Sequence, residues 1–372
     1  MSWSIKDFRR DLVVLKRWLE VTDDYQEKDA LINEMMALYQ HIAEMELSKS
    51  HIYLNVPTVG IIEAPSEDQI EEEELTCNMI LIPKFKLVYP HLGVFKNKLR
   101  VLDGINGVVV PEKNTNLKKS DVIELVDEFY KSITKEIYNH YKKFNKNFIK
   151  FDPRKDVDDG SIYSFPILNK KYIEVGTKGD KRKMLHTLAH ECGHAVGDFI
   201  NPERVMNDDF FDEIESLFFE LIGEDFFSKE LNDNAFKDYQ RSTMYGFYQN
   251  TKDTLSYKNA ISKVFNNMGG NKKPLDLLDE YLDRDGVEDV DIEGNVKYIF
   301  SYIIALELYE TYRQDKEQAI YLLKKLIKTD ENKTEYQKIV ETVTPNKSLI
   351  KVRDRFFTKE YMKANKKEDS NM

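Results

Sequence analysis

The stretch Leu188–Asp198 reads L-A-H-E-C-G-H-A-V-G-D and decides how the rest of the chain is interpreted. Its two histidines stand four residues apart, which places both on one face of an α-helix, and a glutamate directly follows the first. Asp180 is a typical N-cap and Gly197 a typical C-cap, so the sequence predicts a helix over residues 181–196. Nearly opposite the histidines lies an apolar stripe suited to packing, made of Leu185, Leu188, Cys192 and Ala195.

Such a helix carries the chemistry of a catalytic zinc site. The imidazoles of His190 and His194 can hold one Zn²⁺, and Glu191 can take the proton of a metal-bound water as it attacks a carbonyl group. The same pattern also arises by chance in long helices. Gly193 costs roughly 1 kcal/mol against alanine in a helix interior, which predicts close approach of a neighbouring element. His186, one turn earlier, is either an accessory polar group or a surface residue.

A catalytic zinc site needs a third protein ligand, and no histidine follows His194 in the chain. A ligand from the downstream sequence therefore has to be a carboxylate or, second in order, a tyrosine. The apolar segment 210–224 carries Glu213, Glu220 and Glu224 within a narrow arc of a helical wheel, which faces either solvent or a cation. Glu213 is nearest to the histidines in sequence, and Glu220 is better placed to support a ligand from behind.

The composition limits the classes of partner and compartment. The 372 residues are 41% hydrophobic and 33% charged, which is typical of a globular protein with a full core. A net charge of −11 argues against nucleic-acid and anionic-membrane partners, because both favour basic patches. Two distant cysteines, Cys77 and Cys192, fit a reducing compartment. We expect a cytoplasmic protein, without a signal peptide or the roughly 20 apolar residues of a membrane span.

Patterns along the chain predict two domains and a frayed tail over 367–372. Residues 1–115 are expected to form a smaller, mixed α/β N-terminal region, in which a helical hairpin over 4–48 precedes a segment with short β-prone runs at 52–56 and 79–82. Residues 116–366 are expected to form a second domain that is mainly helical. Two strand-like runs interrupt its helices, at 162–165 and 172–175.

The motifs resemble those of the thimet oligopeptidase and oligoendopeptidase F family of zinc peptidases. Residues 190–194 match the family pattern H-E-x-G-H, and residues 211–220 match F-x-E-x-x-S-x-x-x-E. The resemblance implies that Glu213 is the third ligand of one zinc ion per chain. It also implies a mainly α, zincin-like catalytic domain over 116–366, with a small β-sheet beside the H-E-x-x-H helix. The edge strand of that sheet lines the substrate cleft in the family.

The segment Lys297–Tyr309 is similar to the family's tyrosine-bearing helix over the metal. Attack on a peptide carbonyl creates an oxyanion, which needs a hydrogen-bond donor besides the metal. Because no histidine is available downstream, Tyr302 or Tyr298 is expected to supply this donor. As a whole, the tyrosine stripe is more typical of a boundary face with packed rings and hydrated hydroxyls.

We therefore expect a zinc-dependent metallopeptidase that hydrolyses short unstructured peptides, with Glu191 as the general base. The chain departs from the family at Gly197, where members often have a further histidine, and in its short N-terminal part; both bear on efficiency and substrate choice. Two alternatives remain, a regulatory zinc peptidase that cleaves a specific protein such as a repressor, and a catalytically inactive binding protein with a zinc-peptidase fold. The sequence fixes neither cleavage specificity nor oligomeric state.

Overall fold

In the computed structural model of the chain, the described residues are 13–15, 38, 89–110, 117–144, 149–165, 170–201, 213–266, 280–281, 292–328, 338, 342 and 349–368. The strands predicted at 52–56 and 79–82 and most of the hairpin predicted over 4–48 lie outside these residues. The predicted boundary near residue 115 lies outside them too, so the division into domains stays a prediction. Within the described part, no helix is both long and apolar enough to cross a membrane.

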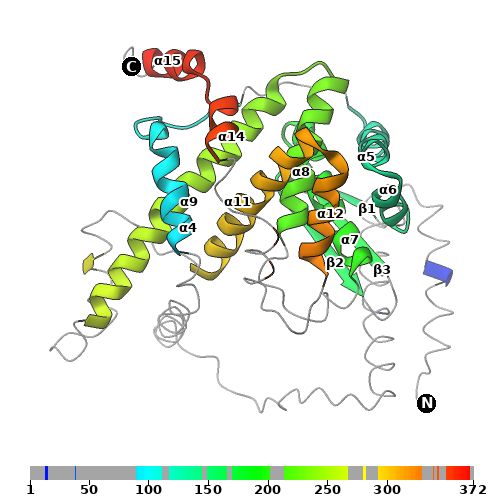
Figure 1. The fold of residues 1–372 in the computed structure, drawn as a ribbon. Coiled ribbons are helices and arrows are strands. Elements are labelled where there is room, and N and C mark those ends of the chain that lie inside the picture. Colours follow the sequence, from blue (N-terminus) through cyan, green and yellow to red (C-terminus); the bar gives the residue numbers. More distant parts are fainter. Residues whose placement is uncertain are drawn as a thin grey trace, which may run out of the picture.

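The described residues are mainly helical and carry one small sheet, which confirms the predicted fold class at this level (Figure 1). A short 3₁₀ helix, η2, covers Arg100–Leu102. The α-helices are α4 (Tyr89–Leu99), α5 (Lys119–Ile133), α6 (Lys135–Tyr141), α7 (Lys181–Ile200), α8 (Ile214–Glu230), α9 (Ala235–Asn266), α11 (Ile292–Gln314), α12 (Lys316–Ile327), α14 (Leu349–Phe356) and α15 (Lys359–Glu368).

The sheet consists of three strands, β1 (Ile149–Asp156), β2 (Gly160–Phe165) and β3 (Lys170–Lys178). Its order is β1-β3-β2, with β1 parallel and β2 antiparallel to the central β3. The strand-like runs at 162–165 and 172–175 fall within β2 and β3 and are confirmed. The sequence did not predict β1, because only Ile149 and Phe151 give it an apolar alternation before Pro153. Proline is tolerated there because β1 is an edge strand.

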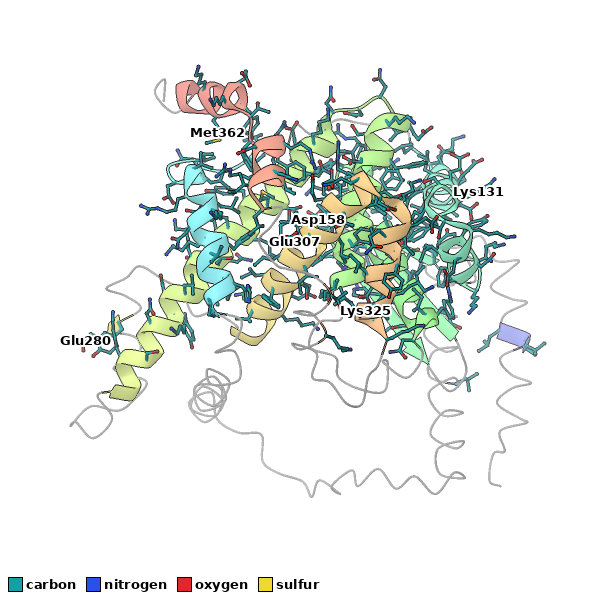
Figure 2. The ribbon with its side chains drawn as sticks, viewed as in Figure 1. Lys131, Asp158, Glu280, Glu307, Lys325 and Met362 are labelled. Carbon is teal, nitrogen blue, oxygen red and sulfur yellow. The ribbon has the colours of Figure 1, made fainter. Side chains whose placement is uncertain are left out.

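Helix α8 is the centre of the core. It packs against α7 on one side and against α9 and α11 on the others, while β3, α5 and α6 cover α7 (Figure 1). Every residue from Ile214 to Glu224 is buried, as expected for a helix that is enclosed all round. Buried acidic groups occur on α11 as well: Figure 2 contrasts Glu307, among the packed helices, with Lys131 on the outer side of α5.

Helix α7 begins where the sequence predicts and ends later. The side chain of Asp180 caps its first turn by accepting a hydrogen bond from the backbone N–H of Arg182, at 3.0 Å. The predicted end near Gly197 is wrong, because the helix continues to Ile200. Packing explains this glycine, since a Cβ atom there would lie 2.7 Å from Oε1 of Glu215 on α8. Gly197 therefore gives α8 room rather than ending α7.

Gly193 allows α7 and α8 to approach closely, as the sequence predicts. A Cβ atom at this position would lie 2.9 Å from Cα of Ser216 and 3.2 Å from the ring of Phe219. We expect Gly193→Ala to lower the free energy of unfolding by about 1–3 kcal/mol, because backbone atoms of α8 would have to shift. The gain in helix propensity, roughly 1 kcal/mol, would not offset this strain. Urea denaturation of the purified chain measures the change.

The matched control is Gly246→Ala within α9, where a Cβ atom would meet nothing within 4 Å. This change has the same gain in helix propensity without the clash, so it should raise the free energy of unfolding by up to about 1 kcal/mol. If both variants change stability in the same direction, the close contact between α7 and α8 does not explain Gly193.

The segment after α4 is attached to α9. The hydroxyl of Tyr245 donates to the carbonyl oxygen of Ile105 at 2.6 Å, and the hydroxyl of Tyr248 donates to the carboxylate of Asp103. Helix α4 itself packs along α9. Helix α4 and the residues after it, up to Ile105, thus lie against α9, one of the helices that surround α8.

Candidate metal centre

The three side chains predicted as zinc ligands converge at the interface between α7 and α8. Helix α7 presents His190 and His194 toward the start of α8, where Glu213 is the N-cap residue. The Nε2 atoms of His190 and His194 lie 3.4 Å and 3.2 Å from the same oxygen, Oε2 of Glu213. The fold therefore brings together residues that are 19 or more positions apart in sequence.

The spacing and chemistry of this donor set fit zinc. Four tetrahedral ligands with bonds of about 2.0–2.2 Å hold their donor atoms roughly 3.3–3.6 Å apart. The two printed separations of 3.4 Å and 3.2 Å are close to that value. Both imidazoles offer the same ring nitrogen to the same point, and two histidines with one carboxylate form a common catalytic zinc set that leaves a fourth position open. His190, His194 and Glu213 are thus able to hold a zinc ion.

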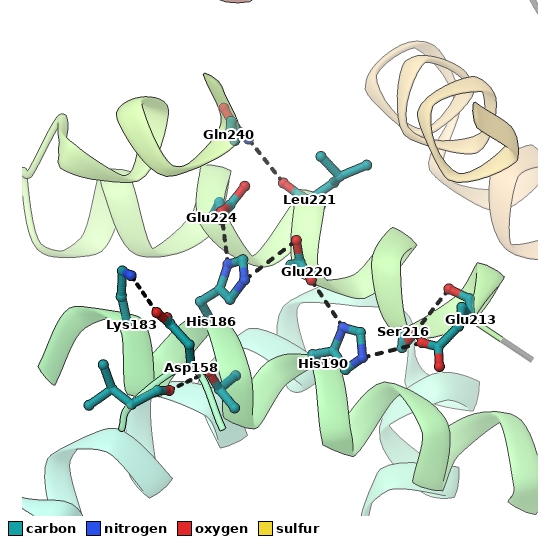
Figure 3. A network of polar contacts seen from close by, with 12 residues as sticks. Asp158, Lys183, His186, His190, Glu213, Ser216, Glu220, Leu221, Glu224 and Gln240 are labelled. Carbon is teal, nitrogen blue, oxygen red and sulfur yellow. Dashed lines mark hydrogen bonds and ion pairs between the residues drawn. The ribbon is translucent and has the colours of Figure 1, made fainter. Parts of the chain in front are cut away.

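Burial decides between the two interpretations of the acidic stripe on α8. Glu213, Glu220 and Glu224 are 5%, 4% and 1% exposed, so they do not form a solvated face. They face α7 instead, where its histidines stand (Figure 3). The alternative that this arc faces solvent is wrong.

Neighbouring side chains hold the three candidate ligands in place. Ser216 Oγ lies 2.9 Å from Oε2 of Glu213 and 3.0 Å from its carbonyl oxygen, so the serine hydroxyl donates to the residue one turn before it. Behind His190, the Nδ1 atom lies 3.0 Å from Oε2 of Glu220, which is the support predicted for this glutamate. Carboxylates that hydrogen-bond the outer nitrogen of a ligating histidine fix its tautomer and orientation.

Glu215 gives His194 a similar neighbour, which sequence reasoning missed. Nδ1 of His194 lies 3.7 Å from Oε1 of Glu215, and that glutamate is buried beside Gly197. On a helical wheel Glu215 falls outside the arc of the other acidic residues of α8. The signal that could have identified it is the glycine at position 197, which leaves space for a carboxylate.

The charges of the cluster are strongly coupled. Burial lowers the pKa of His190, but its hydrogen bonds to Glu213 and Glu220 outweigh this and raise the pKa to about 10. Burial raises the pKa of Glu213, but the charge of His194 and the hydrogen bonds from both histidines hold it well below its usual range. Glu213 is therefore ionised at neutral pH, as a metal ligand must be.

Glu191 lies on the side of α7 that faces the sheet. It is buried against the first residue of β2, since a Cβ atom on Gly160 would lie 2.5 Å from Oε1 of Glu191 and 2.6 Å from Cγ2 of Thr187. Burial raises the pKa of Glu191 above its usual value, although the two histidines act in the opposite direction. The edge strand β2 thus passes directly beside the predicted general base, as the resemblance implies.

His186 belongs to a second polar cluster beside the first (Figure 3). Its Nδ1 lies 2.9 Å from Oε1 of Glu224, and its Nε2 lies 3.5 Å from Oε1 of Glu220. Among the described residues, His186, Glu220 and Glu224 form the only other group of potential ligand side chains as close together as the first. The His186 side chain is partly exposed, and its contacts with two buried glutamates favour the interpretation as an accessory polar group.

The two tyrosines predicted as oxyanion donors have different environments on α11. Tyr302 is 0% exposed, its ring stacks on Phe247, and its hydroxyl has no hydrogen-bond partner among the described residues. Burial, followed by the charges of Glu224 and Glu220, raises its pKa well above the usual value. Tyr298 is 41% exposed. The oxyanion role stays a prediction for both tyrosines.

Solved structures resemble the chain at low sequence identity. A protein described as an oligoendopeptidase F from Bacillus anthracis is 14% identical, with 91% of this chain and 64% of that one covered and a TM-score of 0.45. A protein described as a peptidase from Chlamydophila abortus is 12% identical, with 97% and 63% covered and a TM-score of 0.48. PZ peptidase A, solved with an inhibitor, is 12% identical, with 95% and 71% covered and a TM-score of 0.49.

No protein-family model matches the sequence, and no curated protein matches it. The chain spans less than two thirds of the length of the first two solved proteins. These structures are peptidases by description. Identities and TM-scores this low carry no argument about activity, which has to come from the residues of this chain.

Proposed function

We propose that the chain is a zinc-dependent peptidase that hydrolyses peptide bonds in short unstructured peptides. The observation that carries the proposal is the convergence of both histidine Nε2 atoms on one oxygen of Glu213, with Glu191 on the same helix. A purely structural metal site has no use for a buried carboxylate next to its first ligand. The glutamate therefore favours catalysis over binding alone.

The residues of the chain divide the work as follows. His190, His194 and Glu213 would hold the metal, which would supply Lewis-acid activation of the peptide carbonyl and lower the pKa of water to about 7. Glu191 accepts a proton from the attacking water and passes it to the nitrogen of the leaving amine. Gly160 leaves space for the carboxylate of Glu191 while keeping β2 close to it.

The edge strand of the sheet suits short unstructured peptides as substrates. β2 is at the edge of the three-stranded order, and its first residue touches Glu191. An extended peptide can add to an exposed sheet edge through main-chain hydrogen bonds. This mode of binding does not depend on particular side chains of the peptide. We therefore propose that the substrate pairs with β2, so that its backbone passes the general base.

The proposal is tested with a mixture of short synthetic peptides, whose cleavage is followed by mass spectrometry. The full-length chain should contain about one zinc per chain and cleave several peptides. Removal of the metal with a chelator should lower the rate at least about 10²-fold, and added zinc should restore it. An unchanged rate without metal would contradict the proposal.

The same experiment separates the two alternatives. Cleavage of one folded protein, with none of the short peptides, would identify a regulatory peptidase. Peptides that bind the zinc-loaded chain tightly but remain intact would identify a binding protein.

A further inference from the structure

The second polar cluster has a different geometry from the first. In the first cluster, both histidines direct the same nitrogen, Nε2, at a single oxygen of Glu213. His186 instead contacts two glutamates through two different nitrogens, Nδ1 toward Glu224 and Nε2 toward Glu220. Each ring nitrogen thus faces a different glutamate, so in this structure His186 bridges Glu224 and Glu220.

The bridge continues directly into the candidate metal centre. Glu220 uses its two oxygens on two histidines: Oε2 lies 3.0 Å from Nδ1 of His190, and Oε1 lies 3.5 Å from Nε2 of His186. Nδ1 of His186 lies in turn 2.9 Å from Glu224. Figure 3 shows these contacts as one chain that runs from Glu224 to His190 and on to Glu213.

The helices explain why such a chain forms. His186 and His190 are four residues apart on α7, and Glu220 and Glu224 are four apart on α8, so each pair lies along one face of its helix. The two helices pack side by side, and the pairs face each other with an offset. A glutamate held at both oxygens has fewer accessible rotamers than one held at a single oxygen.

We propose that His186 is a positioning residue for zinc binding, because it holds Glu220 in the rotamer that orients the imidazole of His190. The inference rests on the proposed zinc site. Partners of ligating histidines typically contribute 10–100-fold to metal affinity. Because His186 acts on His190 through Glu220, its loss should weaken zinc binding by about tenfold, at the lower end of that range.

The test is the dissociation constant of zinc, measured by competition with a chromogenic chelator on the full-length chain. His186→Leu should raise this constant about tenfold. His186→Gln, whose amide keeps one hydrogen-bond donor, should lie between His186→Leu and the wild type. The visible absorption of the Co²⁺-loaded protein should change in the same order, because it reports the geometry of the ligands.

The matched control is His140→Gln on α6, which changes a histidine outside both clusters and should leave the zinc constant unchanged. Circular dichroism checks that each variant is folded. If His186→Leu does not fold, His186→Gln decides: a constant at least about threefold higher than the wild type supports the proposal, and an unchanged one overturns it.

The outcomes also distinguish the two proposals. A wild type that binds no zinc would contradict the proposed function itself. A wild type that binds zinc and cleaves peptides, beside a folded His186→Leu with the same zinc constant and Co²⁺ spectrum, would contradict only the role of His186.

Discussion

Glu191→Gln is expected to abolish measurable peptide hydrolysis and to leave zinc bound. Glutamine has the same length and shape as glutamate, so it fits the space that Gly160 leaves beside α7. It cannot accept the proton of the attacking water, and general acid–base catalysis of this kind contributes roughly 10²–10⁴-fold. The same side chain would both accept and return a proton, so we expect kcat to fall by about 10³-fold or more.

Zinc content and peptide cleavage, measured on one preparation of the variant, test this prediction. Zinc content by plasma mass spectrometry should stay near one per chain, because Glu191 is not among the three side chains that converge at the centre. Peptide cleavage should be lost in the same sample. The control is Glu230→Gln at the end of α8, which makes the same change at an exposed position and should affect neither quantity. A Glu191→Gln variant with wild-type kcat would show that another group accepts the proton.

The parts of the site that the sequence predicts are those fixed by the spacing within one helix. His190 and His194 share a face because they are four residues apart, and Asp180 marks the start of α7 by a local hydrogen bond. The absence of histidines downstream indicates only a carboxylate as the third ligand, and the resemblance of the motifs implies that it is Glu213. In the structure, potential ligand atoms of His190, His194 and Glu213 lie close together.

The parts that the sequence does not predict depend on contacts between elements. Gly197 has the local pattern of a helix end, but its actual reason is the side chain of Glu215 on another helix. The position of His186 on a helical wheel shows which face of α7 it occupies. It does not show which side chains of α8 lie opposite that face. In the same way, the tyrosine stripe of α11 gives no indication that Tyr302 is enclosed while Tyr298 is exposed.

The line of carboxylates on α8 is a sequence pattern that fits both an exposed and a buried helix face. A line of carboxylates on an apolar helix is typical of a solvated face, because ionised groups are costly to bury without partners. Here the histidines of α7 supply those partners, so the same line is enclosed. The choice between the two interpretations depends on a packing partner that helical periodicity cannot identify.

Glu213→Ala is expected to remove zinc from the chain. Structural zinc sites with four ligands bind zinc with apparent free energies of about 10–16 kcal/mol. In a site with three protein ligands, each ligand is therefore expected to contribute several kcal/mol to the free energy of zinc binding. We therefore expect the zinc dissociation constant to rise by roughly 10³-fold, and peptide cleavage to be lost with the metal. Competition with a chelator measures the first effect, and metal content after dialysis gives an independent value.

A loss of zinc could also follow from unfolding of α8, and the structure separates the two causes. Although Glu213 is the N-cap residue, its side chain makes no capping hydrogen bond to the helix backbone, so alanine should leave the first turn intact. The far-ultraviolet circular dichroism of the variant should match that of the wild type, and the exposed Glu230→Ala should keep its zinc. A folded Glu213→Ala that still binds zinc as tightly as the wild type would mean that the third ligand is another residue, and the convergence of His190 and His194 on Glu213 would then be an ion-pair cluster only.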